Sequence, residues 1–182
     1  MKLNEGSDSL RTRLREVLAD ASLYAGAKQI GPALDILAEE EEDFARAPDM
    51  AQEALATINA GFLHFVAEGT SDASAAARAV EQFFRMAAIF DRDVRDIDPT
   101  LLGFYKRALL STKTSATPLR RVCRQTSLVE LLRTTSALDG AIAECGCARG
   151  MSSMQMAYSI AASNTEWRGE RFYITYATHS RD

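Results

Sequence analysis

Apolar residues recur at helical spacing along the first half of the chain. The stretches 10–21 and 30–38 carry them every three or four positions, which predicts an amphipathic helix in each. Two more helices follow, one beginning at Pro48 and one capped by residues 69–72. The expected inward side chains are Ala54, Ile58, Phe62 and Phe65 in the first of these, and Val80, Phe83, Phe84 and Ala87 in the second.

Two Xaa-Pro pairs predict further helix starts. Asp98 followed by Pro99 has the form of an N-cap and a proline at the first helical position, and Thr117 followed by Pro118 repeats that form. The helix after Pro99 is expected to bury Leu102, Tyr105 and Leu109. Between the two starts, residues 111–117 are rich in Ser and Thr and are the most loop-like stretch of the chain.

This loop divides the chain into two expected domains. We expect a helical domain over 1–110 and a second domain over 117–182. Two successive helical hairpins, 22–44 and 58–90, are weakly similar to tetratricopeptide repeats. An ordinary helical bundle produces the same pattern, and we favour it because the repeat signature is incomplete.

The hydrophobic pattern changes near residue 139. It predicts a strand over 139–146, a helix over 151–163 capped by Ser152 and Ser153, and a second strand over 171–176. A right-handed crossover would make the two strands parallel neighbours. The expected fold class is therefore α/β, with a helical bundle followed by an incomplete Rossmann-like sheet. The apolar face expected for the connecting helix is Met154, Ala157, Tyr158 and Ala161.

Composition fits a soluble globular protein. The chain has 182 residues, of which 47% are hydrophobic and 25% are charged. No apolar run approaches the ~20 residues that a membrane span needs, and the first residues lack the apolar core of a signal peptide. These features predict a cytoplasmic protein that does not enter a membrane.

Charge is unevenly distributed. Residues 1–99 carry 10 basic and 19 acidic side chains, whereas residues 100–182 carry 11 and 6. The overall net charge of -4 argues against a nucleic-acid-binding protein, although a basic stretch over 106–133 leaves that function open. The acidic helical half leaves open a protein partner or a second copy of the chain.

Metal binding is not indicated by the cysteines and histidines. Cys145 and Cys147 are two positions apart, but zinc needs about four ligands, and the chain has only two histidines. We expect Cys145 to be a small buried strand residue and His64 to be a structural helix residue. We therefore expect no metal site among the residues of this chain.

The segment around residues 144–153 carries the candidate chemistry. Gly146 and Gly150 would let the backbone turn sharply after the first strand and approach a ligand closely. The helix that follows presents free N–H groups and a partial positive charge, which can receive a carboxylate or a phosphate. The spacing matches neither the dinucleotide fingerprint nor the phosphate-binding loop of nucleotide hydrolases.

The sequence around these glycines is more specific. The chain reads Ala-Ile-Ala-Glu-Cys-Gly-Cys-Ala-Arg-Gly-Met-Ser-Ser over 141–153, preceded by Thr117-Pro118-Leu-Arg. It resembles the macrocin O-methyltransferase (TylF/MycF-like) family of class I S-adenosylmethionine-dependent methyltransferases, whose loop reads approximately G-D-[IV]-A-E-x-G-V-x-R-G-x-[SA]-S. The resemblance covers about residues 117–176.

This resemblance implies a cofactor site and a reaction. The residues that would line the site for the methionine part of S-adenosyl-L-methionine are Glu144, Gly146, Arg149, Gly150, Ser152 and Ser153. The implied reaction is methyl transfer to a hydroxyl of a sugar or another small molecule. The family's bound Mg²⁺ would have its ligands, like the catalytic base, outside this chain.

One part of the family pattern is missing. The second strand should end in an acid that holds the ribose hydroxyls, within a phrase similar to Y-D-[TS]-F-E-G, but here Ala177 to Asp182 follow the strand without it. A reading-frame shift before Ala177 would restore that phrase for suitable codons. We therefore expect a truncated, inactive methyltransferase. The alternative is a helical protein-interaction module whose C-terminal unit is a relic.

Overall fold

The computed structural model describes residues 12, 16, 34–36, 39, 48–64, 73–113, 118–135, 138, 140–147, 149–163 and 172–176. The chain divides into two units. The first contains Met1–Asp96 and Ser115–Arg121, and the second contains Ile97–Thr114 and Val122–Asp182. The helices expected over 10–21 and 30–38, and the first repeat-like hairpin, 22–44, lie largely outside the described residues. Of the second hairpin, residues 58–64 and 73–90 are described and helical.

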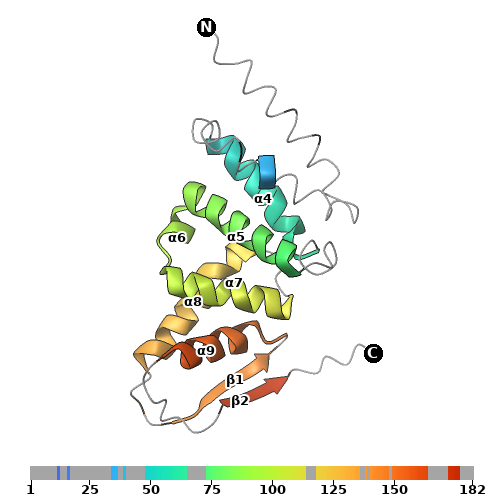
Figure 1. Ribbon diagram of the computed structural model, residues 1–182. Helices are drawn as coiled ribbons and strands as arrows, with labels where there is room; N and C mark the ends of the chain where they lie inside the picture. The colour runs from blue at the N-terminus through green and yellow to red at the C-terminus, as the bar shows by residue number, and fades with distance from the viewer. Residues whose placement is uncertain are drawn as a thin grey trace. The chain divides into compact units, whose positions relative to one another are not determined.

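The described part is helical apart from two short strands (Figure 1). This bears out a mixed helix and strand composition, with most of the described residues in helices. In chain order the elements are α4 (Pro48–His64), α5 (Ala73–Phe90), α6 (Arg92–Arg95), α7 (Pro99–Thr112), α8 (Pro118–Thr134), β1 (Ile142–Cys147), α9 (Met151–Ala162) and β2 (Phe172–Tyr176).

Helix starts follow the capping signals closely. The Asp98 carboxylate accepts hydrogen bonds from the backbone N–H groups of Thr100, at 2.8 Å, and Leu101, at 3.1 Å, so Asp98 is the N-cap of α7. Helices α4 and α8 likewise begin at prolines. The short helix α6 was not expected, and it forms because the Asp91 side chain caps it by accepting from the N–H groups of Asp93 and Val94.

We expect Asp98→Ala to lower the free energy of unfolding by about 1 kcal/mol, because two N–H groups of α7 lose their acceptor. Hydrogen bonds from the backbone, the one from Leu101 foremost, hold the pKa of Asp98 below the usual value of an aspartate. Since the folded state favours the carboxylate, this stabilisation is complete above the ordinary pKa and is lost as pH falls through the lowered one. Urea unfolding of both proteins between pH 2 and pH 7 measures it.

The control is Asp98→Asn, which keeps a capping oxygen but has no titrating carboxyl group. We expect its free energy of unfolding near pH 7 to stay close to that of the parent chain. As pH falls, its free energy of unfolding should decrease less than that of the parent chain. If alanine and asparagine behaved alike at every pH, the cap would not stabilise α7.

The core of the first unit is formed by apolar sides of α4 and α5. The expected positions are confirmed where they are described, since Ile58, Val80, Phe83 and Ala87 have no exposed surface. A side chain also joins distant segments, because Gln82 Nε2 donates to the carbonyl oxygen of Leu34 at 2.8 Å. Long-range hydrophobic and polar contacts therefore hold this unit together.

The core of the second unit lies between α7, α8 and α9. Leu101, Phe104 and Val129 form a buried cluster, against which Ile97 and Tyr158 pack. Of the side chains expected to be buried in α7, Tyr105 and Leu109 are buried, whereas Leu102 is half-buried. This cluster fixes α9, which also contacts β1, between α7 and the sheet (Figure 1).

Polar contacts extend this packing along α9. The Arg107 guanidinium lies 4.8 Å from the centre of the Tyr158 ring and 5.2 Å from that of Phe104. The hydroxyl groups of Ser111 and Tyr158 are 2.9 Å apart. Met151 in the first turn of α9 and Tyr158 two turns later thus both contact α7, since Thr112 Oγ1 also lies 3.4 Å from the sulfur of Met151.

The two strands are parallel neighbours, as expected from the crossover. The register pairs Ile142 with Phe172 and Glu144 with Ile174. Strand β1 begins at Ile142 rather than at residue 139, and β2 falls within its expected range.

Two expectations about buried side chains are wrong. In α9, Ala157 and Ala161 are exposed, and the buried residues are Ser153, Gln155, Met156 and Ser159. Polar side chains can occupy buried positions when hydrogen bonds satisfy them, and hydrophobic periodicity does not reveal such positions.

The second wrong expectation concerns Cys145 on β1, which was expected to be buried. It is exposed, because successive side chains of a strand point to opposite faces and the neighbouring Glu144 is the half-buried one.

Candidate functional site

The connection from β1 to α9 begins with an irregularity in the sheet. Cys145 pairs with Thr175 and Cys147 pairs with Tyr176, so two steps along β1 match one step along β2. Gly146 is the additional residue of this bulge. A bulge redirects the strand locally and often lies beside a functional site.

Gly150 makes the turn into α9. It is the N-cap residue, with φ 79° and ψ 15°, which is the left-handed region that glycine adopts without strain. As a glycine it has no side chain with which to cap the helix. The expectation that Ser152 and Ser153 act as caps is therefore wrong, because the helix begins at Met151 and both serines lie inside its first turn.

We expect Gly150→Ala to lower the free energy of unfolding by about 1–2 kcal/mol through backbone strain. The ideal control is Gly103→Ala in α7, because an added Cβ has nothing within 4 Å at either glycine. Gly103 lies inside a helix, where alanine should stabilise by about 0.5–1 kcal/mol. In thermal unfolding we expect a lower Tm for Gly150→Ala and a higher Tm for Gly103→Ala. Equal changes in Tm for the two variants would contradict the left-handed turn at Gly150.

Glu144 and Ser153 join the strand to the helix. The Ser153 hydroxyl donates to the Glu144 carboxylate, and Ser153 is buried whereas Glu144 is half-buried. Residues nine positions apart thus meet across the loop, on the side of β1 that α9 covers. The contact places a negative charge beside the first turn of α9, where the helix dipole stabilises it.

The other expected site residues border the same loop. Arg149 is exposed and directly precedes Gly150, and Ser152 is half-buried in the first turn of α9. The structure therefore brings all six together around one connection: Glu144, Gly146, Arg149, Gly150, Ser152 and Ser153. Their roles toward a cofactor stay predictions.

Gln155 is a polar residue near this loop that the sequence did not indicate. It has no exposed surface, and its Nε2 donates to Gln125 Oε1 at 3.1 Å and to the Met151 carbonyl oxygen at 3.4 Å. Its own Oε1 is buried without a hydrogen-bond partner in the described part of the chain. Such an atom costs free energy unless a donor reaches it. Nothing in the local pattern marks this glutamine, because helical spacing places it beside the expected apolar face.

The described residues offer no metal centre. Nowhere in the described ranges do three or more His, Cys, Asp or Glu side chains come together in a way that could hold a metal ion. The family resemblance places the ligands of its divalent metal outside this chain, so these residues do not test that metal. The roles open to the residues of the β1–α9 loop are those of binding and orienting a ligand.

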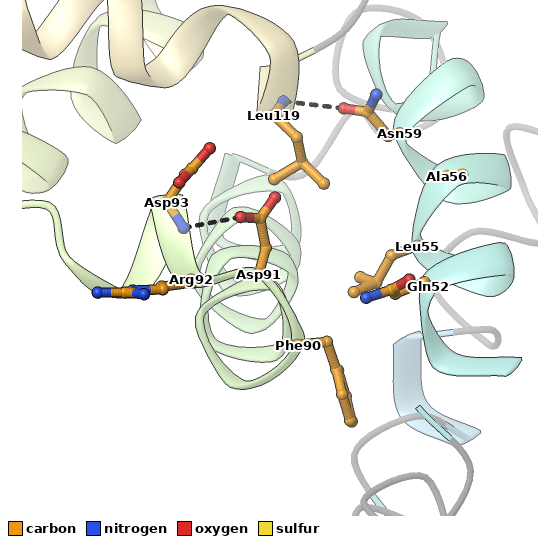
Figure 2. A pocket seen from close by; sticks show the side chains of 9 residues that line it. All are labelled: Gln52, Leu55, Ala56, Asn59, Phe90, Asp91, Arg92, Asp93 and Leu119. Carbon is orange, nitrogen blue, oxygen red and sulfur yellow. Dashed lines mark hydrogen bonds between the residues drawn. The ribbon is translucent and has the colours of Figure 1, made fainter. Parts of the chain in front are cut away.

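A separate groove lies within the first unit (Figure 2). It has a volume of about 550 Å³ and is lined by Gln52, Leu55, Ala56, Asn59, Phe90, Asp91, Arg92, Asp93 and Leu119. Three of its polar side chains already have structural roles. The Asn59 side chain accepts from the Leu119 N–H at 2.9 Å, Asp91 caps α6, and Arg92 turns away to Asp96.

Comparisons with known proteins assign no family. The chain matches no protein-family model, no curated protein and no solved structure. None of the helices described here is long and apolar enough to cross a membrane. The loop and its geometry are therefore the basis of any functional proposal.

Proposed function

We propose that the β1–α9 loop binds S-adenosyl-L-methionine and that the chain is part of an O-methyltransferase. The observation that carries this proposal is the combination of Gly150 in a left-handed turn with the N-terminus of α9 directly after it. It occurs at the carboxyl end of a parallel strand, where ligands bind in open α/β sheets. The resemblance of residues 141–153 to the macrocin O-methyltransferase family supports the same assignment.

The chemistry of these groups fits the methionine part of the cofactor. The first N–H groups of α9 have no acceptor within the helix, and its first internal hydrogen bond runs from the Met154 N–H to the Gly150 carbonyl oxygen. They would bind the carboxylate of the cofactor. The Glu144 carboxylate would pair with the ammonium group, while Ser153 keeps it oriented.

S-adenosyl-L-methionine would supply an electrophilic methyl group for a hydroxyl of a sugar or another small molecule. The chain's own residues would bind and orient the cofactor. Gly150 would let the backbone approach it, and the exposed Arg149 would add a positive charge beside the loop. A general base for the substrate hydroxyl is not assigned to any residue of the chain.

Equilibrium dialysis against labelled S-adenosyl-L-methionine tests the proposal. We expect saturable binding of one molecule per chain, displaced by S-adenosylhomocysteine and not by ATP. Glu144→Gln should weaken the binding roughly ten- to a hundredfold, because a charged hydrogen bond is lost. Absence of saturable binding by the parent chain would contradict the proposal.

A second candidate function is a helical protein-interaction module. It is favoured by the first unit, whose described elements are all helices and which carries the groove of Figure 2. In that case a protein partner would bind the first unit, and the β1–α9 loop would not bind S-adenosyl-L-methionine. Retention of a partner without any affinity for the cofactor would favour this alternative.

A further inference from the structure

The groove of the first unit has the size and the apolar surface of a small-molecule site. Its volume of about 550 Å³ lies within the range of ligand pockets, about 300–1,000 Å³. Leu55, Phe90 and Leu119 supply apolar side chains to it (Figure 2). Phe90 and Leu119 are only half-buried, so a ligand in the groove would remove further apolar surface from water.

The groove is acidic on the side formed by α6. Asp91 and Asp93 lie there, across from the residues of α4 (Figure 2). The cap of α6 uses one oxygen of Asp91, because Oδ1 accepts from the N–H groups of Asp93 at 2.9 Å and Val94 at 3.4 Å. In the described part of the chain neither carboxylate forms an ion pair. Two negative charges therefore border the apolar surface.

The cation among the lining residues is engaged elsewhere. Arg92 turns away from the groove, and its Nε lies 3.3 Å from Oδ2 of Asp96 (Figure 2). The other polar lining residues, Gln52 and Asn59, are neutral amides. Residues 1–99 also carry 19 acidic against 10 basic side chains, which adds to the negative potential. Charge complementarity therefore requires a positive ligand.

We propose that this groove binds a small organic amine, with a cationic ammonium group attached to an apolar body of about the size of an aromatic ring system. The ammonium group pairs with Asp91 and Asp93, and the apolar body packs against Leu55, Phe90 and Leu119. This site lies in the first unit and does not depend on the function proposed for the β1–α9 loop.

Other occupants fit the groove less well. A neutral apolar ligand would take the two carboxylates partly out of water without giving them a partner, which costs free energy. An anion would be repelled. A long helix from another protein would meet the link between α8 and α4 at one end of the groove, where the Leu119 N–H donates to Asn59 Oδ1 at 2.9 Å (Figure 2).

Titration of the isotope-labelled full chain with tryptamine, which is a cation at pH 7, tests the proposal. We expect saturable shifts of the backbone amides of Asp91, Asp93 and Leu119, while the β1–α9 loop does not move. Tryptophol, with a hydroxyl in place of the ammonium group, should bind at least about threefold more weakly. Ethylammonium, which lacks the apolar body, should bind at least about tenfold more weakly.

Variants of the groove test the pairing. Asp93→Asn should weaken tryptamine binding about threefold, and adding Asp91→Asn should weaken it further, while asparagine still caps α6. Glu53→Gln is the matched control, because Glu53 is exposed on α4 and does not line the groove. Ala56→Lys, at an exposed lining position, would place a cation in the groove and should weaken binding at least about tenfold.

Four outcomes would overturn the proposal. The first is the absence of saturable shifts at the groove with tryptamine. The second is tryptophol binding as tightly as tryptamine, because the carboxylates would then have no part in recognition. The third is equal weakening by Asp93→Asn and Glu53→Gln, which would show a general charge effect. The fourth is unchanged binding by Ala56→Lys, which would place the amine elsewhere.

Discussion

Phe83→Ala should lower the free energy of unfolding by about 3–5 kcal/mol, the range for removing a buried aromatic side chain. Phe83 has no exposed surface. Its ring meets that of Phe84 edge-on, with the centres 5.2 Å apart and the planes at 80°. Alanine would leave a cavity in the first unit and remove this aromatic contact. Urea unfolding followed by circular dichroism measures the change.

Phe90→Ala is the matched control for this loss. It makes the same chemical change on the same helix, but Phe90 is only half-buried at the C-terminal end of α5. We expect a clearly smaller destabilisation, because solvent can reach the space that the ring leaves. Equal losses at both positions, or a loss below about 1 kcal/mol for Phe83→Ala, would contradict the assignment of the core.

The second large effect concerns ligand binding. Gly146→Val should reduce the affinity for S-adenosyl-L-methionine at least about a hundredfold, or roughly 2.7 kcal/mol. Gly146 lies at the bulge that turns β1 toward the loop, and a branched side chain there would occupy space that the ligand needs. Calorimetric titration of the folded variant measures this loss.

Ala143→Val is the control on the same strand. Ala143 is exposed and pairs with Tyr173, and valine is favoured in strands. We expect it to keep both the fold and the affinity of the parent chain. If Gly146→Val bound S-adenosyl-L-methionine with the affinity of the parent chain, Gly146 would have only a structural role in the chain turn.

Helix starts were predictable because their causes are local. Asp98 with Pro99, and Pro118, marked the beginnings of α7 and α8, since capping and proline geometry depend only on neighbouring residues. The parallel pairing of β1 with β2 followed from the handedness of the crossover. The capping of α6 by Asp91 is equally local, but a helix of four residues has no periodicity to indicate it.

The inward side of α9 was not predictable, because it depends on distant partners. Gln155 is buried with Gln125 as its hydrogen-bond partner, 30 residues earlier in the chain. Ser153 is buried against Glu144 on β1. Alanines at 157 and 161 look apolar in the sequence, yet they face solvent because α7 and β1 contact other sides of the helix.

The sequence identified which residues form the candidate site, but it did not predict the backbone geometry that they adopt. The glycines and Glu144 stood out in the sequence, and they do border one loop. The sequence did not reveal that Gly146 lies at a bulge or that Gly150 takes the capping position in place of the serines. The bulge depends on the pairing register of β1 with β2, and the cap depends on the residue at which α9 begins. The pattern of apolar and polar residues locates such boundaries only to within a few residues.

The most direct measurement is a titration of the isotope-labelled chain with S-adenosyl-L-methionine, followed by the backbone amide resonances. We expect saturable shifts centred on Arg149, Gly150 and the first turn of α9, because these N–H groups would bind the ligand's carboxylate. The resonances of α4 and α5 should not move. Shifts confined to the groove of the first unit, or no saturable shift at the β1–α9 loop, would contradict a cofactor site at this loop.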